Sequence, residues 1–116
     1  MKNTLSINKQ LEALFNIVAE SHARIQRDFK DINPIVGVNQ AMREQGVPAD
    51  LVTIDCSKSE KRIILILQDE EPGIIRYQFS FKDKDPNEKF EDIGSDELTA
   101  DRLYDWIKGY FSDMAN

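Results

Sequence analysis

The chain has 116 residues, of which 41% are hydrophobic and 31% are charged, and its formal net charge is −6 at pH 7. This length fits a single domain, residues 1–116, with one core, and the composition is typical of a globular protein rather than a fibrous or disordered one. The acidic balance argues against a nucleic-acid partner, because neutralising phosphates requires clustered Lys and Arg.

The sequence gives no reason to expect a signal peptide or a membrane span. The N-terminal residues contain no apolar run that fits a signal peptide, and the longest uninterrupted apolar stretch, residues 63–67, is too short to span a bilayer. The single cysteine, Cys56, cannot form an internal disulfide, which fits a reducing compartment. We therefore expect a cytoplasmic protein without a membrane partner.

The first predicted element is a long amphipathic helix over residues 6–31. Its apolar residues recur at three- and four-residue spacing, the period of one helical face. Asn33 and Pro34 then match the cap and the first-turn residue of a helix, and Gly46 and Pro48 match a helix end. We therefore predict a second helix between Pro34 and Gly46.

Beyond Pro48 the apolar pattern alternates, as in strands. Residues 51–56 predict a half-buried strand, residues 61–68 are apolar on both faces as a central strand requires, and residues 74–81 alternate again. A short fourth strand at 90–93 would close the edge of the sheet.

The last predicted element is a helix that Thr99 caps, with Leu98 and Leu103 at the spacing of a hydrophobic staple. Together the patterns predict the α+β class: two N-terminal helices, a three- or four-stranded antiparallel meander and a C-terminal helix. The helices are expected to pack on one face of the sheet.

No segment carries a motif that names a reaction. The glycines are scattered, so neither a P-loop nor a dinucleotide fingerprint is present, and no serine stands in a G-x-S-x-G sequence. Residues 83–87 place oxygen side chains as a calcium loop does, but Glu88 replaces the required glycine and Gly94 the bidentate carboxylate. We expect no metal ion and no cofactor.

The single histidine, His22, lies along the apolar side of the first predicted helix. With one His and one Cys, a zinc site of these residues cannot be assembled within one subunit. We interpret His22 as a residue at the edge of the core. The alternative is a catalytic pair between Cys56 and His22.

The negative charge is concentrated near the C-terminal end. Residues 83–105 hold nine acidic and three basic residues, a difference of six that equals the net charge, whereas the first fifty residues hold six of each. Glu97, Asp101 and Asp105 recur every four residues and predict an acidic stripe, with Tyr104 and Trp106 as aromatic anchors beside it. The competing explanation is that acids are stabilised near a helix N-terminus, and that the aromatic residues complete the core.

The second candidate surface is the sheet face opposite the helices. There Ile64 and Ile66 would form an apolar centre, and Arg76 would lie on its polar border. The competing interpretation is a partly covered sheet with ordinary exposed apolar residues.

These observations predict a noncatalytic protein-interaction module of the adaptor, chaperone or inhibitor kind. It would bind a protein partner, for which a basic charge would fit, through residues 83–105, the open sheet face or both, and would self-associate through that face. The alternative is a small enzyme or ligand-binding domain with a pocket between helices and sheet, using His22 or loop carboxylates.

Overall fold

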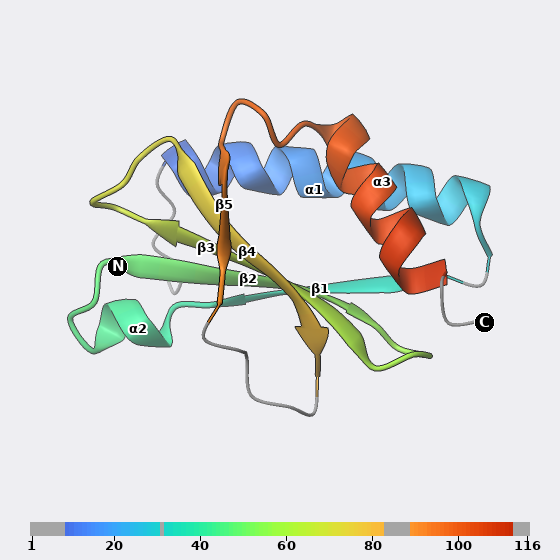
Figure 1. Cartoon of the computed structure of the whole chain (residues 1–116), viewed down its shortest axis with the longest axis horizontal. Helices are drawn as coiled ribbons and strands as arrows, with labels where there is room; N and C mark the ends of the chain where they lie inside the picture. Colours follow the sequence, from blue (N-terminus) through green and yellow to red (C-terminus); the bar gives the residue numbers. More distant parts are fainter. Residues whose placement is uncertain (1–8, 31, 83–88, 113–116) are drawn as a thin grey trace, which may run out of the picture.

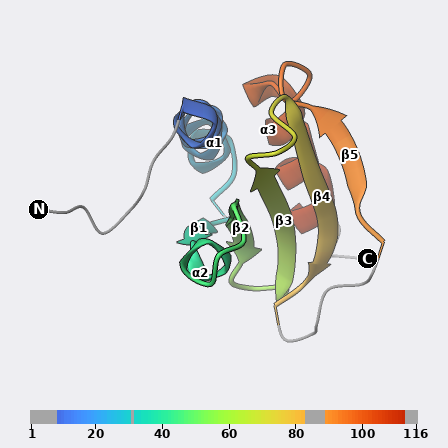
Figure 2. The ribbon, with the colours of Figure 1, turned by 90° about the vertical axis from the view of Figure 1, so that its left-hand side faces the viewer.

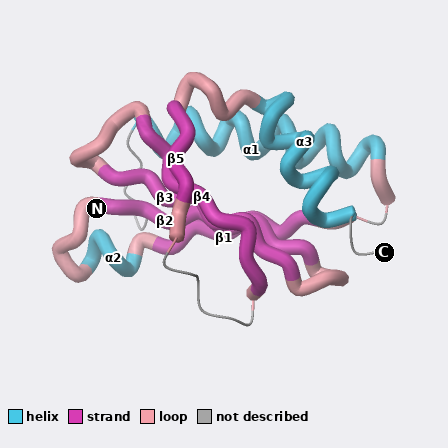
Figure 3. Tube along the Cα trace, in the orientation of Figure 1, coloured by secondary structure: helices cyan, strands magenta, loops and turns pink. Residues whose placement is uncertain are grey.

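The computed structural model describes residues 9–30, 32–82 and 89–112. It confirms the α+β class, and the elements follow one another as α1 (Lys9–Asp28), β1 (Pro34–Asn39), α2 (Ala41–Glu44), β2 (Ala49–Cys56), β3 (Lys61–Gln68), β4 (Ile74–Phe81), β5 (Glu91–Gly94) and α3 (Ala100–Phe111). The five strands form an antiparallel meander in the order β1-β2-β3-β4-β5, with α1 and α3 on one face of the sheet (Figures 1 and 3).

The long first helix is confirmed over Lys9–Asp28, while residues 6–8 and 31 of its predicted range lie outside the described residues. Its inward face buries Leu11, Leu14, Val18 and Ile25, as the three- and four-residue spacing predicts. Figure 2 shows α1 over the β1 and β2 side of the sheet and α3 behind β3 and β4.

The second predicted helix is wrong over most of its length. Residues 34–39 form β1, which pairs with β2 from Pro34 opposite Cys56 to Asn39 opposite Leu51. The β-branched residues 35, 36 and 38 favour a strand. A proline at the first position of an edge strand needs no ladder hydrogen bond. The Asn33-Pro34 pair, which indicated the start of a helix, therefore also fits the start of a strand.

Only α2, of four residues, remains of that predicted helix. The side-chain oxygen of Asn39 accepts a hydrogen bond from the Ala41 amide at 2.7 Å, and Gly46 follows α2 with a φ of +94° that favours glycine. The sheet therefore has five strands rather than the predicted three or four.

The other strands follow the sequence pattern. β3 is the central strand, and the inward residues of β2, which are Val52, Ile54 and Cys56, are buried as their alternation predicts. β5 confirms the short closing strand, but it pairs only with residues 74–77 of β4. The second half of β4 therefore extends past β5.

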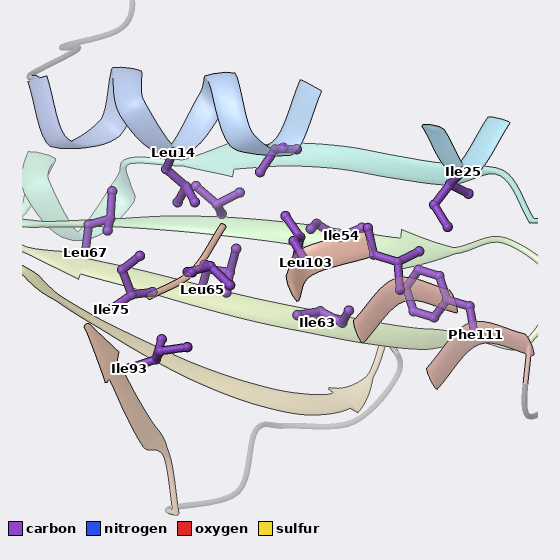
Figure 4. Close-up of a cluster of buried hydrophobic side chains, with 14 of the residues drawn as sticks. Leu14, Ile25, Ile54, Ile63, Leu65, Leu67, Ile75, Ile93, Leu103 and Phe111 are labelled. Atoms are coloured by element: carbon purple, nitrogen blue, oxygen red, sulfur yellow. The ribbon is translucent and has the colours of Figure 1, made fainter. Parts of the chain in front are cut away.

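The core lies between the sheet and the two helices α1 and α3 (Figure 4). The side chain of Thr99 caps α3 by accepting a hydrogen bond from the Arg102 amide at 3.2 Å, and both predicted staple residues, Leu98 and Leu103, are fully buried. Along α3, Leu103, Ile107 and Phe111 face the strands. None of the helices in the described ranges is long and apolar enough to cross a membrane.

Candidate functional site

Two residues of the predicted acidic and aromatic surface join α3 to α1. Asp101 accepts a hydrogen bond from Arg24 Nη1 at 2.5 Å, and the Tyr104 hydroxyl donates to Asp28 Oδ2 at 2.6 Å. The Arg24 guanidinium lies 4.6 Å from the centre of the Tyr104 ring. The hydrogen bond to Asp28 raises the pKa of Tyr104, because it stabilises the protonated phenol. These contacts link the two helices at the surface and pair the charge of Asp101 with that of Arg24.

The other two acids of the predicted stripe lie in different surroundings. Glu97 precedes α3, and its Oε1 accepts a hydrogen bond from the Gly94 amide at 3.3 Å. Asp105 is exposed on α3, and no ion pair joins it to another described residue. The stripe is therefore divided among a turn, an ion pair with α1 and one solvated carboxylate.

The calcium-like loop at residues 83–87 lies outside the described residues, as does Glu88. Within the described ranges, no group of three or more His, Cys, Asp or Glu side chains could hold a metal ion.

The open sheet face has an apolar centre bordered by ion pairs. Ile64 is buried there between Thr53 and Gln78 of the neighbouring strands, and Ile66 is half-buried beside Arg76. The Nε atom of Arg76 lies 3.4 Å from an Asp92 oxygen, and its Nη2 atom lies 3.6 Å from a Glu71 oxygen. The structure thus brings Ile64, Ile66 and Arg76 to one face, where little of Ile64 is accessible.

A cluster of aromatic side chains lies where β4 passes α3. The aromatic surface consists of Tyr77, Phe79 and Phe81 from β4 with Trp106 and Tyr110 from α3. The centre of the Phe79 ring lies 5.4 Å from that of Trp106 and 5.0 Å from that of Tyr110, and Tyr77 lies 4.5 Å from Trp106. Phe79 and Phe81 are each 40% exposed. The cluster therefore presents large apolar rings to solvent.

Hydrogen bonds fix Tyr110 of α3 in place. The Tyr110 hydroxyl donates to the Ser80 carbonyl at 2.8 Å, and Lys61 Nζ donates to the Tyr110 carbonyl at 3.0 Å while lying 4.8 Å from its ring centre. Burial raises the pKa of Tyr110, so the ring stays uncharged at neutral pH. A hollow of about 340 Å³ lies alongside, lined by Tyr77, Gln78, Phe79, Lys89 and Glu91. The aromatic surface is therefore preorganised.

The lone histidine lies at an apolar groove between α1 and β1. This groove, of about 530 Å³, is lined by Phe15, Val18, Ala19, His22 and Val36. His22 Nε2 lies 2.8 Å from the Pro34 carbonyl oxygen, and because a carbonyl only accepts, Nε2 must carry a proton. No described carboxylate forms a hydrogen bond with the imidazole, and Cys56 is buried. The described residues therefore assemble no nucleophile and base around His22.

The most deeply buried charge belongs to a cluster at the end of β2. Asp50, fully buried, accepts hydrogen bonds from Arg43 Nε at 2.9 Å, Arg43 Nη2 at 3.0 Å and Gln40 Nε2 at 2.9 Å. Arg43 also donates to both carboxylate oxygens of Asp69 at 2.9 Å, which lowers the pKa of Asp69. Because the buried charge of Asp50 is compensated by Arg43 and both carboxylates are hydrogen-bonded, the cluster fits a structural clasp that fixes α2 to the sheet.

Sequence patterns identified Trp106 but neither the exposure of Phe79 and Phe81 nor the contact of Tyr110 with Phe79. Their alternation and helical spacing indicated core positions, and these residues do face the helix side. The difference in strand length could have indicated these residues. β4 has eight residues and β5 has four, so the second half of β4 extends past β5.

Comparison with protein-family models, with curated proteins and with solved structures finds no match to this chain.

Proposed function

We propose that the chain is a noncatalytic protein-interaction module whose contact site is the aromatic surface. The observation that carries this proposal is the partial exposure of Phe79 within a fixed ring cluster, together with that of Phe81 two residues further along β4. Trp and Tyr are the residues that most often dominate binding energy in interfaces, and they do so in rigid, partly preformed sites. Trp106 and Tyr110 fulfil both conditions.

Charges of both signs surround this surface, since Lys61 and Lys89 lie beside it as well, and its carboxylates offer contacts to a partner segment that carries both apolar and basic side chains. Asp105 is exposed directly before Trp106 in the chain, and Glu91 lines the hollow beside Tyr77. A Lys or Arg of the partner could contact these carboxylates and the faces of the rings together. The acidic region around residues 83–105 would then raise the association rate rather than provide most of the affinity.

Site-specific crosslinking tests the proposal. A photoreactive phenylalanine analogue replaces Phe81, and the same analogue replaces Val47 as the control, because Val47 is 47% exposed and lies outside the aromatic surface. Irradiation in cells should give a crosslinked partner from position 81 and none from position 47. The partner is then identified and purified for direct binding measurements.

Direct binding to that partner provides the quantitative test. Phe81→Ser should weaken binding at least about tenfold, as expected when an interface anchor is truncated, whereas Val47→Ser should leave the Kd unchanged. Asp105→Lys should weaken binding most at low salt if the partner is basic. Equal crosslinking from both positions, or equal Kd values for the two serine variants, would refute the proposal.

A further inference from the structure

The two edges of the sheet differ in how they are protected. β5 has four residues and carries Glu91 and Asp92, and short, charged edges resist pairing with another chain. β1 has six residues, none of them charged, and no strand formed by the described residues pairs with its outer side. An uncharged edge of this length is suited to accept another strand.

Hydrogen bonds of the neighbouring strands show which β1 groups point outward. The carbonyls of Pro48 and Cys56 accept hydrogen bonds from Asp69 at 2.9 Å and Glu60 at 3.2 Å, so even-numbered residues of β2 point toward β3. Because successive residues of a strand alternate, the odd-numbered residues of β2 pair with β1.

The register then fixes the direction of each group in β1. Ile35, Gly37 and Asn39 lie opposite odd-numbered β2 residues and point toward them, whereas Val36 and Val38 direct their N–H and C=O groups to the open edge. Pro34 also points outward, and its carbonyl is bonded to His22. The groups available for pairing are therefore those of Val36 and Val38, centred on Gly37.

The side chains of the β1 edge are also incompletely covered. Val36 faces the helix side yet is 38% exposed in the groove beside Phe15 and Ala19, and Ile35 on the opposite face is 51% exposed. An apolar groove next to an unpaired strand is the arrangement in which an added strand gains both backbone hydrogen bonds and side-chain burial.

The distribution of charge allows a second copy of the chain to be the occupant of this edge. The first fifty residues hold six acidic and six basic residues, whereas the C-terminal part carries the whole excess of negative charge. Two copies with a net charge of −6 repel each other least when they meet through their balanced halves, and α1 and β1 belong to that half.

We propose that two copies pair antiparallel through β1 about a two-fold axis at Gly37, normal to the sheet. Val36 of each copy then lies opposite Val38 of the other, and each such pair exchanges two N–H···O=C bonds. Pro34, which has no N–H, lies outside the pairs, and its carbonyl keeps the bond to His22. Directly opposite residues share a face, so the two α1 helices lie on the same side and the two grooves adjoin, closing over Val36. The five-stranded sheets become one continuous sheet.

Sedimentation equilibrium tests this proposal on the full chain. The expected mass is twice the 13.4 kDa of the chain, and Val36→Lys should reduce it to 13.4 kDa because like charges then meet near the axis. Val47→Lys is the matched control, since Val47 has similar exposure and lies outside β1, and it should keep the doubled mass. Far-UV circular dichroism verifies that both variants fold.

Hydrogen exchange of the Val36 and Val38 amides distinguishes a second copy from the other possible occupants of the β1 edge. Protection of both amides in the wild type and its loss in Val36→Lys would support the paired edge. A wild-type mass of 13.4 kDa overturns the proposal, whether or not the amides are protected. Protected amides would then mean that the chain covers its own edge. Unprotected amides would mean that the edge is open to a different protein. A doubled mass that Val36→Lys leaves intact would place the interface elsewhere.

Discussion

Replacing Arg43 with methionine should be among the most damaging single changes outside the hydrophobic core. Methionine retains much of the side chain but removes both donors to Asp50, which leaves the buried carboxylate with Gln40 alone. Removing one partner of a buried ion pair costs about 3–5 kcal/mol. Arg43 is 24% exposed, so water reduces this cost, and we expect the free energy of unfolding to fall by about 3 kcal/mol.

A second substitution separates the buried charge from the loss of contacts. Asp50→Asn in the Arg43→Met background removes the charge while keeping the size of the side chain, and it should recover at least about half of the lost stability. Asp69 needs no compensation, because its carboxylate is 39% exposed and can be hydrated.

Urea unfolding at pH 7 gives these free energies. Trp106, the only tryptophan, provides the fluorescence signal, and circular dichroism provides an independent one. An Arg43→Met cost below about 1 kcal/mol, or a double variant no more stable than Arg43→Met, would show that the clasp does not depend on a neutralised buried charge.

Two further predictions concern the clasp and the cap of α3. The Arg43 hydrogen bonds hold the pKa of Asp69 below 3.8, so the Asp69 carboxylate binds a proton less readily in the folded state than in the unfolded state. The contribution of Asp69 to the free energy of unfolding is therefore present above about pH 4 and is lost as the pH falls through the lowered pKa. Acid unfolding between about pH 4 and pH 2 should therefore be less steep for Asp69→Asn than for the wild type, and equal slopes would contradict the assignment. Thr99→Ala should cost about 1 kcal/mol in urea unfolding because the Arg102 amide loses its acceptor, whereas Thr99→Ser should keep most of that stability; equal losses would exclude the cap as the cause.

Much of the fold could be predicted because local patterns and tertiary burial agree in most segments. The helical spacing of α1, the alternation of β2 and β4 and the Thr99 cap all appear in the structure. At residues 34–39 two local signals disagreed. The Asn33-Pro34 pair favoured a helix start, but the pairing of three β-branched residues with β2 outweighs that local preference.

The candidate site could be predicted only in part, because it depends on contacts between distant segments. The ion pair of Arg24 with Asp101 joins residues 77 positions apart, and nothing near Asp101 in the sequence indicates that its carboxylate is paired. The exposure of Phe79 depends on where β5 ends relative to β4, which is a property of the sheet rather than of the β4 sequence.

The fluorescence of Trp106 tests the proposed function most directly. Because it is the only tryptophan and lies within the aromatic surface, its emission reports on this site alone. When the purified partner that crosslinking identified is titrated into the protein, we predict that the Trp106 emission shifts to shorter wavelength and that Trp106 is protected from acrylamide quenching. Both changes should give the same Kd as calorimetry. Calorimetric binding with unchanged Trp106 emission and quenching would contradict the account, because the partner would then bind away from the aromatic surface.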